Sequence, residues 1–294
     1  MFQQLGFSVL LFMTFVIRGS CREGSMDLDF NLTRPIKRPP KLTKPTAMSQ
    51  QSPINLHTAD AVPKGYPPLR FHGHFHLSPE NSPMIKNDHG TVQIGESRRG
   101  ENRATMTGGP LNGTAYRFAQ CHFHWGNQSD VGSEHTVDGH PYSMEVHCVH
   151  HNTKYDSVDA ALGQADGICV VAFFLKASPK KSADSNLFNL IVRHLSRIQK
   201  DGSEDLAEPT ILSVFKPYAT PNGWHTYIGS LTTPPYTENV RWIAYPGAPV
   251  QVTDQQVGLF RHLKDNHGAM IGSNFREIQP LNGRTISMAQ KTQQ

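Results

Sequence analysis

The residues with the clearest chemical potential are three histidines in two short segments. His122 and His124 are separated by one residue, and His147 follows 23 residues later. Side chains at positions i and i+2 of a β-strand point to the same side of the sheet, so these two imidazoles can reach one metal ion. A third imidazole from a neighbouring strand leaves one tetrahedral position open, as in catalytic zinc sites. The sequence therefore predicts one Zn²⁺ held by His122, His124 and His147.

Two polar residues support this choice of ligands. Gln120 lies two residues before His122, and Glu145 lies two residues before His147. Metal-bound imidazoles usually donate their second N–H to a carboxylate, amide or carbonyl, which fixes the tautomer and raises the basicity of the ligand. We therefore expect Gln120 and Glu145 to orient these two ligands from behind.

A competing set of histidines is His72, His74 and His76, which alternate in the same way. Gly73 and the nearby Pro and Ser residues indicate an exposed, irregular strand. No carboxylate or amide stands beside these histidines to orient them. The triplet is therefore the weaker candidate for a metal site.

The elements that must position the ligands are predicted to be mostly strands. Short β-rich runs recur between turn signals, at residues 91–94, 116–125, 143–150, 167–175 and 240–245. Only two stretches have a helical pattern, residues 186–198 and 254–263. The 294 residues, with 24 Gly and 21 Pro, suit a loop-rich globular protein. We expect one mainly β (α+β) domain.

The first residues resemble an export signal. Residues 5–17 form an uncharged, mostly apolar run that small residues follow, and the run is too short to span a bilayer comfortably. No Lys or Arg precedes it. We expect a signal peptide at 1–20, a Pro-rich basic arm at 24–48, the folded domain at 49–288 and a polar tail at 289–294.

Export carries further expectations. The protein would be secreted and extracellular, and the sequons at Asn31, Asn112 and Asn127 would be glycan acceptors. No other apolar segment reaches membrane-spanning length, so we expect no membrane anchor. The net charge of +4 is mild and most basic residues are scattered, so nucleic acid is not an expected partner.

The cysteines, at 21, 121, 148 and 169, do not form a disulfide framework for a chain of this length. Cys21 lies at or before the expected cleavage site, which leaves an odd number. Cys121 and Cys148 alternate with the metal-face residues and should point into apolar packing. Buried free thiols are favoured over a disulfide.

Several motifs together carry a resemblance to a known family: QSPINL at 51–56, GGPL at 108–111, FHWG at 123–126, GSEHTVD at 132–138, EVHCVHHNTK at 145–154, GSLTTPP at 229–235 and QPL at 279–281. In this order, the chain resembles the α-class carbonic anhydrases. The resemblance implies a single domain around a large twisted, mostly antiparallel sheet. A few peripheral helices would surround it, with zinc at the bottom of a conical cleft.

The resemblance also implies roles for individual residues. The three histidines become the zinc ligands of a lyase that hydrates carbon dioxide reversibly to bicarbonate and a proton, by attack of zinc-bound hydroxide. Thr232 would accept a hydrogen bond from this hydroxide and donate its own to Glu134, which aims a lone pair at the incoming carbon. Thr233 would help to bind substrate or bicarbonate.

Carbon dioxide is small and uncharged, so its pocket needs apolar walls. The resemblance assigns these walls to Val149, Val170, Leu231 and Trp242. Val149 also follows from spacing, because it shares a strand face with His147.

Proton release is where the chain departs from the family pattern. Active members often have a shuttle histidine in Asn-Asn-Gly-His-Thr-Val-Gln, whereas residues 87–93 read Asn-Asp-His-Gly-Thr-Val-Gln. Gly90 therefore occupies the shuttle position and His89 lies beside it. An imidazole suits proton relay near neutral pH. Our hypothesis is that His89 relays protons, and the alternative is release to solvent or buffer.

Three other functions are alternatives to carbon dioxide hydration. Catalytically silent binding modules of the family lack one or more ligand histidines, and all three are present here. Ester hydrolysis would be a side activity of the same site. An extracellular matrix or mineral-associated binding protein with weak activity, using the arm or the 72/74/76 triplet, is the main alternative.

Overall fold

The computed structural model describes residues 48–76, 82–95 and 104–290. The expected signal peptide, Asn31, Cys21 and the end of the polar tail lie outside these residues, as does the arm apart from Met48. Residues from Met48 onward belong to one compact unit.

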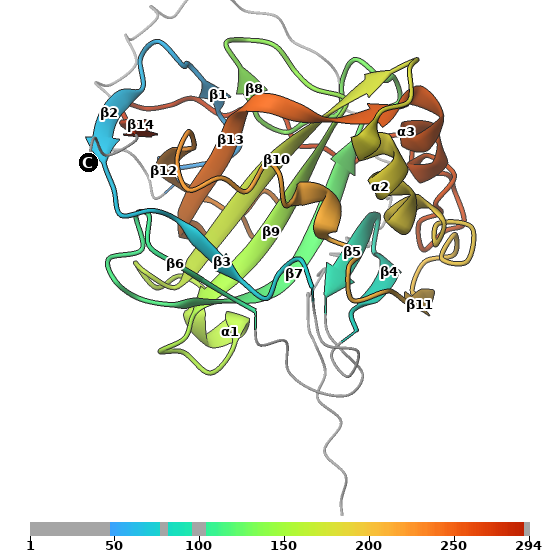
Figure 1. The fold of residues 1–294 in the computed structure, drawn as a ribbon, viewed down its shortest axis with the longest axis horizontal. Coiled ribbons are helices and arrows are strands. Elements are labelled where there is room, and N and C mark those ends of the chain that lie inside the picture. The colour runs from blue at the N-terminus through green and yellow to red at the C-terminus, as the bar shows by residue number, and fades with distance from the viewer. Residues whose placement is uncertain (1–47, 77–81, 96–103, 291–294) are drawn as a thin grey trace, which may run out of the picture. The chain divides into compact units, whose positions relative to one another are not determined.

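Most strands of the described part join one large sheet. Among the described residues this sheet has 12 strands, in the order β11-β4-β5-β7-β9-β10-β13-β12-β14-β2, with β6 paired to β7 and β3 paired to β6. The strands are β2 (Val62–Gly65), β3 (Arg70–His72), β4 (Met84–Asp88), β5 (Thr91–Gly95), β6 (Thr105–Thr107), β7 (Tyr116–Trp125), β9 (Met144–Asn152), β10 (Ile168–Ser178), β11 (Glu204–Leu206), β12 (His225–Ser230), β13 (Glu238–Thr253) and β14 (Ser287–Gln290). Figure 1 shows β7, β9, β10 and β13 side by side in the middle of the twisted sheet.

Strand directions in this sheet are mixed. The pairs β10–β13 and β14–β2 are parallel, and the other described pairs of the large sheet are antiparallel. Two short strands, β1 (Asn55–Leu56) and β8 (Thr136–Val137), form a separate parallel pair. The expected mainly β fold with a mostly antiparallel sheet is confirmed.

The central strands are buried on both faces because two cores sandwich them. Every residue of β9 is buried, and so are the first eight of β10. Along β10, Val171 and Phe173 belong to the main core, whereas Val170 and Ala172 belong to a second, smaller core. This alternation follows from the two-residue period of a strand. The strands that carry the candidate ligands are thus packed on both sides.

The described part of the chain holds few helices: α1 (Val158–Ala161), α2 (Ala183–Val192), α3 (Asp254–Phe260) and the 3₁₀ turn η2 (Ser213–Phe215). In Figure 1, α2 and α3 lie next to each other at one end of the sheet. Within the described residues, no helix has the length and apolar character needed to cross a membrane.

The boundaries predicted for the first helix were wrong. The helix α2 begins earlier because Ser182 and Ser185 form a capping box. It ends at Val192, and the chain continues in turns that still bury Leu195 and Ile198. The apolar pattern therefore extends beyond the helix. The second helix, α3, begins at Asp254 as predicted, capped by Thr253.

The expectation of free thiols at Cys121 and Cys148 was wrong. These two residues form a disulfide, and Cys169 is a buried free cysteine. Both cysteines do point into the main core, as expected. However, β7 and β9 pair in a register that sets Cys121 directly opposite Cys148. Sequence spacing alone gives the face of each residue but not the register between strands.

Candidate metal centre

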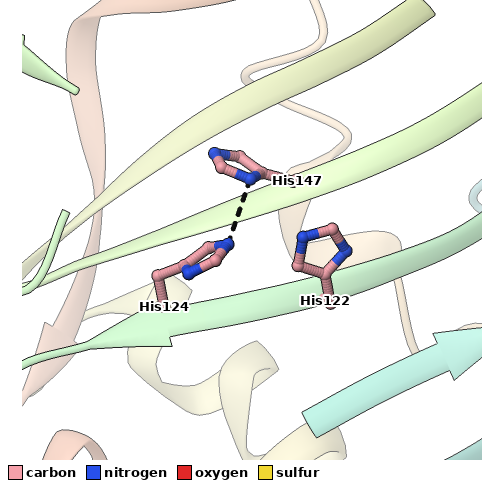
Figure 2. A group of neighbouring side chains, drawn as sticks. All are labelled: His122, His124 and His147. Carbon is pink, nitrogen blue, oxygen red and sulfur yellow. Dashed lines mark hydrogen bonds between the residues drawn. The ribbon is translucent and has the colours of Figure 1, made fainter. Parts of the chain in front are cut away.

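Three imidazoles converge on the face of β7 and β9 opposite the disulfide. His122 lies directly across from His147 in the strand register, and His124 lies two residues further along β7. One nitrogen from each ring lies within 4.8 Å of the others. Figure 2 shows the three rings turned toward a common point. The arrangement can hold a metal ion.

Two of these rings are anchored by the residues that sequence spacing picked out. Gln120 Oε1 lies 2.9 Å from His122 Nδ1, and Glu145 Oε1 lies 2.7 Å from His147 Nε2. Both oxygens are hydrogen-bond acceptors, so the ring nitrogens that face them carry the protons. This leaves a lone pair on His122 Nε2 and another on His147 Nδ1.

The third ring is anchored by a residue that sequence reasoning missed. The backbone oxygen of Asn274 lies 3.1 Å from His124 Nδ1. The Asn274 side chain is itself tied to β7, since its Oδ1 accepts the Trp125 N–H at 2.8 Å and its amide donates to the Phe123 oxygen at 2.9 Å. A partner 150 positions away in sequence, acting through its main chain, leaves no signal in the local pattern.

The resulting geometry suits a cation. His124 Nε2 and His147 Nδ1 lie 3.1 Å apart, the contact drawn dashed in Figure 2. A hydrogen bond between these two nitrogens would need a proton on one of them. Because each ring already carries a proton on its other nitrogen, the ring with the second proton would be an imidazolium. Burial lowers the pKa of His124, and also that of His122. A ring that donates its proton through the far nitrogen presents a lone pair at the near one, and such lone pairs are what a metal ion such as Zn²⁺ binds.

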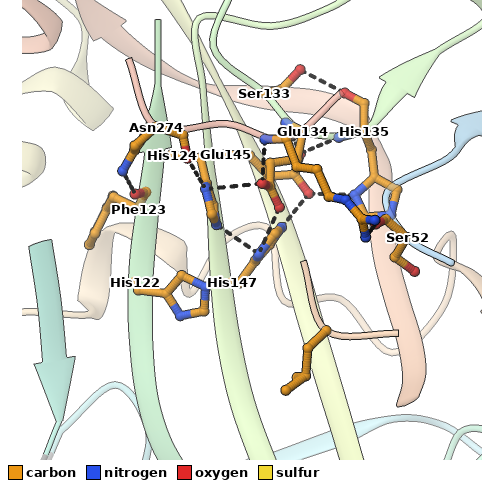
Figure 3. Close-up of polar contacts among 12 residues, drawn as sticks. Ser52, His122, Phe123, His124, Ser133, Glu134, His135, Glu145, His147 and Asn274 are labelled. Carbon is orange, nitrogen blue, oxygen red and sulfur yellow. Dashed lines mark hydrogen bonds and ion pairs between the residues drawn. The ribbon is translucent and has the colours of Figure 1, made fainter. Parts of the chain in front are cut away.

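A buried network supports Glu145. Its Oε1 is also 2.7 Å from His135 Nδ1, and its Oε2 accepts the backbone N–H groups of Glu134 and His135 at 2.9 and 2.8 Å. Figure 3 shows these contacts meeting at the carboxylate. Burial alone would raise the pKa of Glu145, but the neighbouring His135 and His147 lower it well below its usual range. Glu145 therefore stays ionised.

His135 extends this network away from the metal centre. Its Nε2 lies 2.7 Å from the Tyr227 hydroxyl, which lies 2.8 Å from Ser52 Oγ. The group His135, Glu145 and His147 also satisfies the spacing for a metal site. In this group Glu145 Oε1 lies 2.7 Å from a nitrogen of each of the two rings, which is the length of a charge-assisted hydrogen bond. We therefore interpret the group as a support of the His122/His124/His147 centre and not as a second metal site.

Glu134 lies at the edge of the centre. Its Oε1 accepts the backbone N–H of Arg276 at 2.8 Å and lies 3.4 Å from His124 Nδ1. Its Oε2 is buried, 3.7 Å from His147 Nδ1, and accepts no hydrogen bond from the described residues. Thr232 is buried in the turn after β12, and Thr233 beside it is half-buried. Glu134 thus has a free acceptor beside the ligands.

The predicted apolar residues lie beside the ligands. Val149, Val170 and Trp242 are directly opposite one another on β9, β10 and β13. All three are buried in the second core, with Leu231 packed against it. The Trp242 ring centroid is 4.7 Å from that of His147. The structure therefore places Trp242 beside His147, in register with Val149 and Val170.

His89 lies in the turn between β4 and β5, with φ of 47°. Its ring Nδ1 is 3.4 Å from Asp201 Oδ2, and the ring is 55% exposed. Of the sequons, Asn112 and Asn127 are both exposed.

The competing histidine triplet does not share one face. The strand β3 ends at His72, and His74 is buried with its Nε2 2.9 Å from His150 Nε2, whereas His72 and His76 are exposed. In the described ranges, none of the three joins a group able to hold a metal.

Comparison with known proteins agrees with this geometry. The model of the eukaryotic-type carbonic anhydrase family matches residues 40–290. The chain is 36% identical over 246 residues to carbonic anhydrase 7 of Homo sapiens, covering 81% of this chain and 87% of that protein. It is 36% identical over 243 residues to carbonic anhydrase 3 of Equus caballus, covering 80% and 88%. It is 34% identical over 244 residues to carbonic anhydrase 6 of Canis lupus familiaris, covering 81% and 72%. The chain therefore belongs to the eukaryotic-type carbonic anhydrase family.

Proposed function

We propose that the protein catalyses the reversible hydration of carbon dioxide to bicarbonate and a proton, with one zinc ion held by His122, His124 and His147. One observation carries the proposal. Each ring has one nitrogen tied to an acceptor, one nitrogen of each ring lies within 4.8 Å of the others, and the free nitrogens of His124 and His147 lie 3.1 Å apart. Family membership supports the same activity.

The ligands and their supports have separate tasks. In this enzyme class a bound zinc ion is known to acidify coordinated water, so that a nucleophile is available near neutral pH. Gln120, Asn274 and Glu145 each hold one ring nitrogen, which favours the tautomer whose other nitrogen presents a lone pair. The ionised Glu145 also raises the basicity of His147.

Thr232 and Glu134 are proposed to orient the nucleophile. A hydroxyl that donates its only proton to a carboxylate must accept the next hydrogen bond through its oxygen. The free acceptor at Glu134 Oε2 supports this role, because it is buried beside the ligands. Thr233 is proposed to help bind substrate or bicarbonate.

The apolar wall of Val149, Val170, Leu231 and Trp242 is proposed to take up carbon dioxide. Support comes from the burial of three of these side chains next to His147. An uncharged substrate loses little hydration on entering such a pocket, whereas the bicarbonate anion is bound less favourably there. The wall would therefore favour release of the charged product.

His89 is proposed to relay the proton, and its exposed ring supports this role. Turnover of the wild type and of His89→Ala should diverge at low buffer concentration and converge at high buffer concentration. Identical curves would exclude the relay and leave release to solvent or buffer.

Secretion is also proposed. Support comes from the apolar run at residues 5–17, the exposed Asn112 and Asn127, and the Cys121–Cys148 disulfide, since disulfides persist in oxidising compartments. Expression in a eukaryotic secretory host should yield protein in the medium that loses mass on treatment with a glycosidase. The matrix-associated alternative gains no support from His72, His74 and His76, which do not share a face.

The test of the main proposal is zinc content together with stopped-flow hydration of carbon dioxide. Wild type should bind one zinc ion and be active, and His147→Ala should lose both. His267→Ala, at an exposed position, is the matched control and should behave as wild type. A wild type that binds one zinc ion without hydrating carbon dioxide would instead be a binding module.

A further inference from the structure

The disulfide lies immediately next to the metal centre along both strands. Cys121 directly precedes His122 on β7, and Cys148 directly follows His147 on β9. The β7–β9 register pairs Cys121 with Cys148 and His122 with His147. Two neighbouring residue pairs of the β7–β9 register, called rungs below, therefore carry the covalent link and two of the three proposed ligands.

The two rungs face opposite sides of the sheet. The cysteines belong to the main core, where Ile94 on β5 lies opposite Cys121 and Val171 on β10 lies opposite Cys148. Successive side chains of a strand alternate between faces, so the imidazoles project to the other side. The sulfur atoms thus lie on the core side of the sheet, directly behind His122 and His147. Only 0% of Cys121 and 7% of Cys148 is exposed.

This location bears on how well the ligands are held. Metal sites require their ligand atoms within about 0.2 Å of ideal distances. Neighbouring strands joined only by hydrogen bonds can open or shift locally, whereas a covalent link one residue from each ligand removes most of that freedom at the rung. The third ligand, His124, is on the same strand as His122, so the link constrains the whole triad.

We propose that the Cys121–Cys148 disulfide is a positioning element of the metal centre, which slows zinc loss by fixing His122 relative to His147. This inference rests on the proposed zinc site. It makes Cys121 and Cys148 positioning residues that act through the ligands. Reduction of the disulfide would loosen the centre.

The reduction can be written with a trialkylphosphine as the reductant. Phosphorus attacks one sulfur and the other leaves as a thiolate, which takes a proton. Water then releases the second thiol and converts the phosphine to its oxide. Two electrons pass from phosphorus to the disulfide. Bound zinc would join His122 to His147 one residue away from the disulfide, so it should also reduce the local opening of β7 from β9 that exposes the sulfur atoms to the phosphine.

The experiment measures transfer of zinc from the loaded protein to a coloured chelator, well below the unfolding transition. The Cys121→Ala, Cys148→Ala double variant should release zinc about tenfold to a hundredfold faster than wild type, the factor by which the loss of other ligand supports lowers metal affinity. Cys169→Ala, which removes the buried free thiol of the neighbouring strand, is the matched control and should release zinc at the wild-type rate.

A second readout separates positioning from general stability. A disulfide also restricts the unfolded chain, so the double variant should unfold at lower urea concentration without zinc. A purely structural link would change this midpoint and leave the zinc release rate as in wild type, and that result would overturn the proposal. If wild type binds no zinc at all, the proposed function fails instead.

Wild-type protein provides a test without substitution, which also covers a double variant that does not fold. Phosphine reduction followed by alkylation, counted by mass spectrometry, should be slower with zinc bound than after zinc removal. Protein that has been reduced but not alkylated should lose zinc faster than the oxidised protein. Equal reduction rates with and without zinc would overturn the inference.

Discussion

Glu145 accepts a hydrogen bond from His147 at 2.7 Å, from a position two residues earlier on the same strand. The carboxylate is completely buried, and its pKa is lowered by the imidazoles around it. A buried negative charge thus stands directly behind one proposed ligand.

Replacing this charge should weaken the metal centre without removing a ligand. We expect Glu145→Gln to lower zinc affinity about tenfold to a hundredfold, since the neutral amide polarises the His147 ring less. Competition with a chelator of known affinity measures the change. Glu277→Gln, at an exposed position, is the control. Equal affinities for wild type and Glu145→Gln would show that the charge does not act on the ligand.

Thr232→Val keeps the shape of the side chain and removes the proposed donor to Glu134. We expect zinc content to stay the same and kcat for carbon dioxide hydration to fall on the order of a hundredfold. Thr105→Val on β6 serves as the control. A variant with wild-type kcat would contradict the orienting role of Thr232.

At Gly95 the strand β5 comes very close to Gln120 on β7. A Cβ at Gly95 would meet Gln120 Cβ at 2.7 Å and the Ala119 oxygen at 2.8 Å. We expect Gly95→Ala to displace Gln120 from His122 and to lower zinc affinity. Gly258→Ala is the matched control, because a Cβ there meets no atom within 4 Å and Ala favours a helix. Unchanged zinc affinity in Gly95→Ala would contradict the prediction that crowding at Gly95 weakens the support of His122 by Gln120.

The buried His74–His150 pair predicts acid sensitivity. Burial lowers the pKa of His150 to about 4, and burial together with the His150 charge lowers that of His74. The unfolded chain titrates near 6.5, so between pH 6.5 and 4 it binds more protons than the folded protein. Stability should therefore be complete above pH 6.5 and fall as the pH drops toward 4.

For His150 alone this loss is about 3 kcal/mol across the window. Urea unfolding midpoints between pH 4 and 8 measure the loss. His74→Gln should flatten the dependence on pH, whereas His267→Ala should leave its slope unchanged. A slope in His74→Gln as steep as in wild type would exclude a contribution from the pair.

Strand-face arguments predicted much of the geometry of this candidate centre from sequence. The two-residue period identified His122 and His124, and the same period selected Gln120 and Glu145. It also placed Cys121 correctly in the core. Local spacing carries this information because each strand sets its own faces.

What could not be predicted depends on how distant segments pair. The Cys121–Cys148 disulfide needs the β7–β9 register, and the Asn274 contact to His124 needs a chain path across 150 residues. The predicted strand 240–245 was too short, because β13 continues to Thr253. The register with β10 shifts between the Tyr245 and Val250 pairs, so the Pro and Gly residues there form an irregularity within the strand.

The contacts of Asn274 and Arg276 also set an order of events during synthesis. His124 and His147 are made early, but the main-chain oxygen that fixes the His124 tautomer belongs to residue 274, and the N–H that holds Glu134 belongs to residue 276. A ribosome-bound chain that stops short of these residues lacks both. The supports of the proposed centre are therefore complete only once nearly the whole domain has been made.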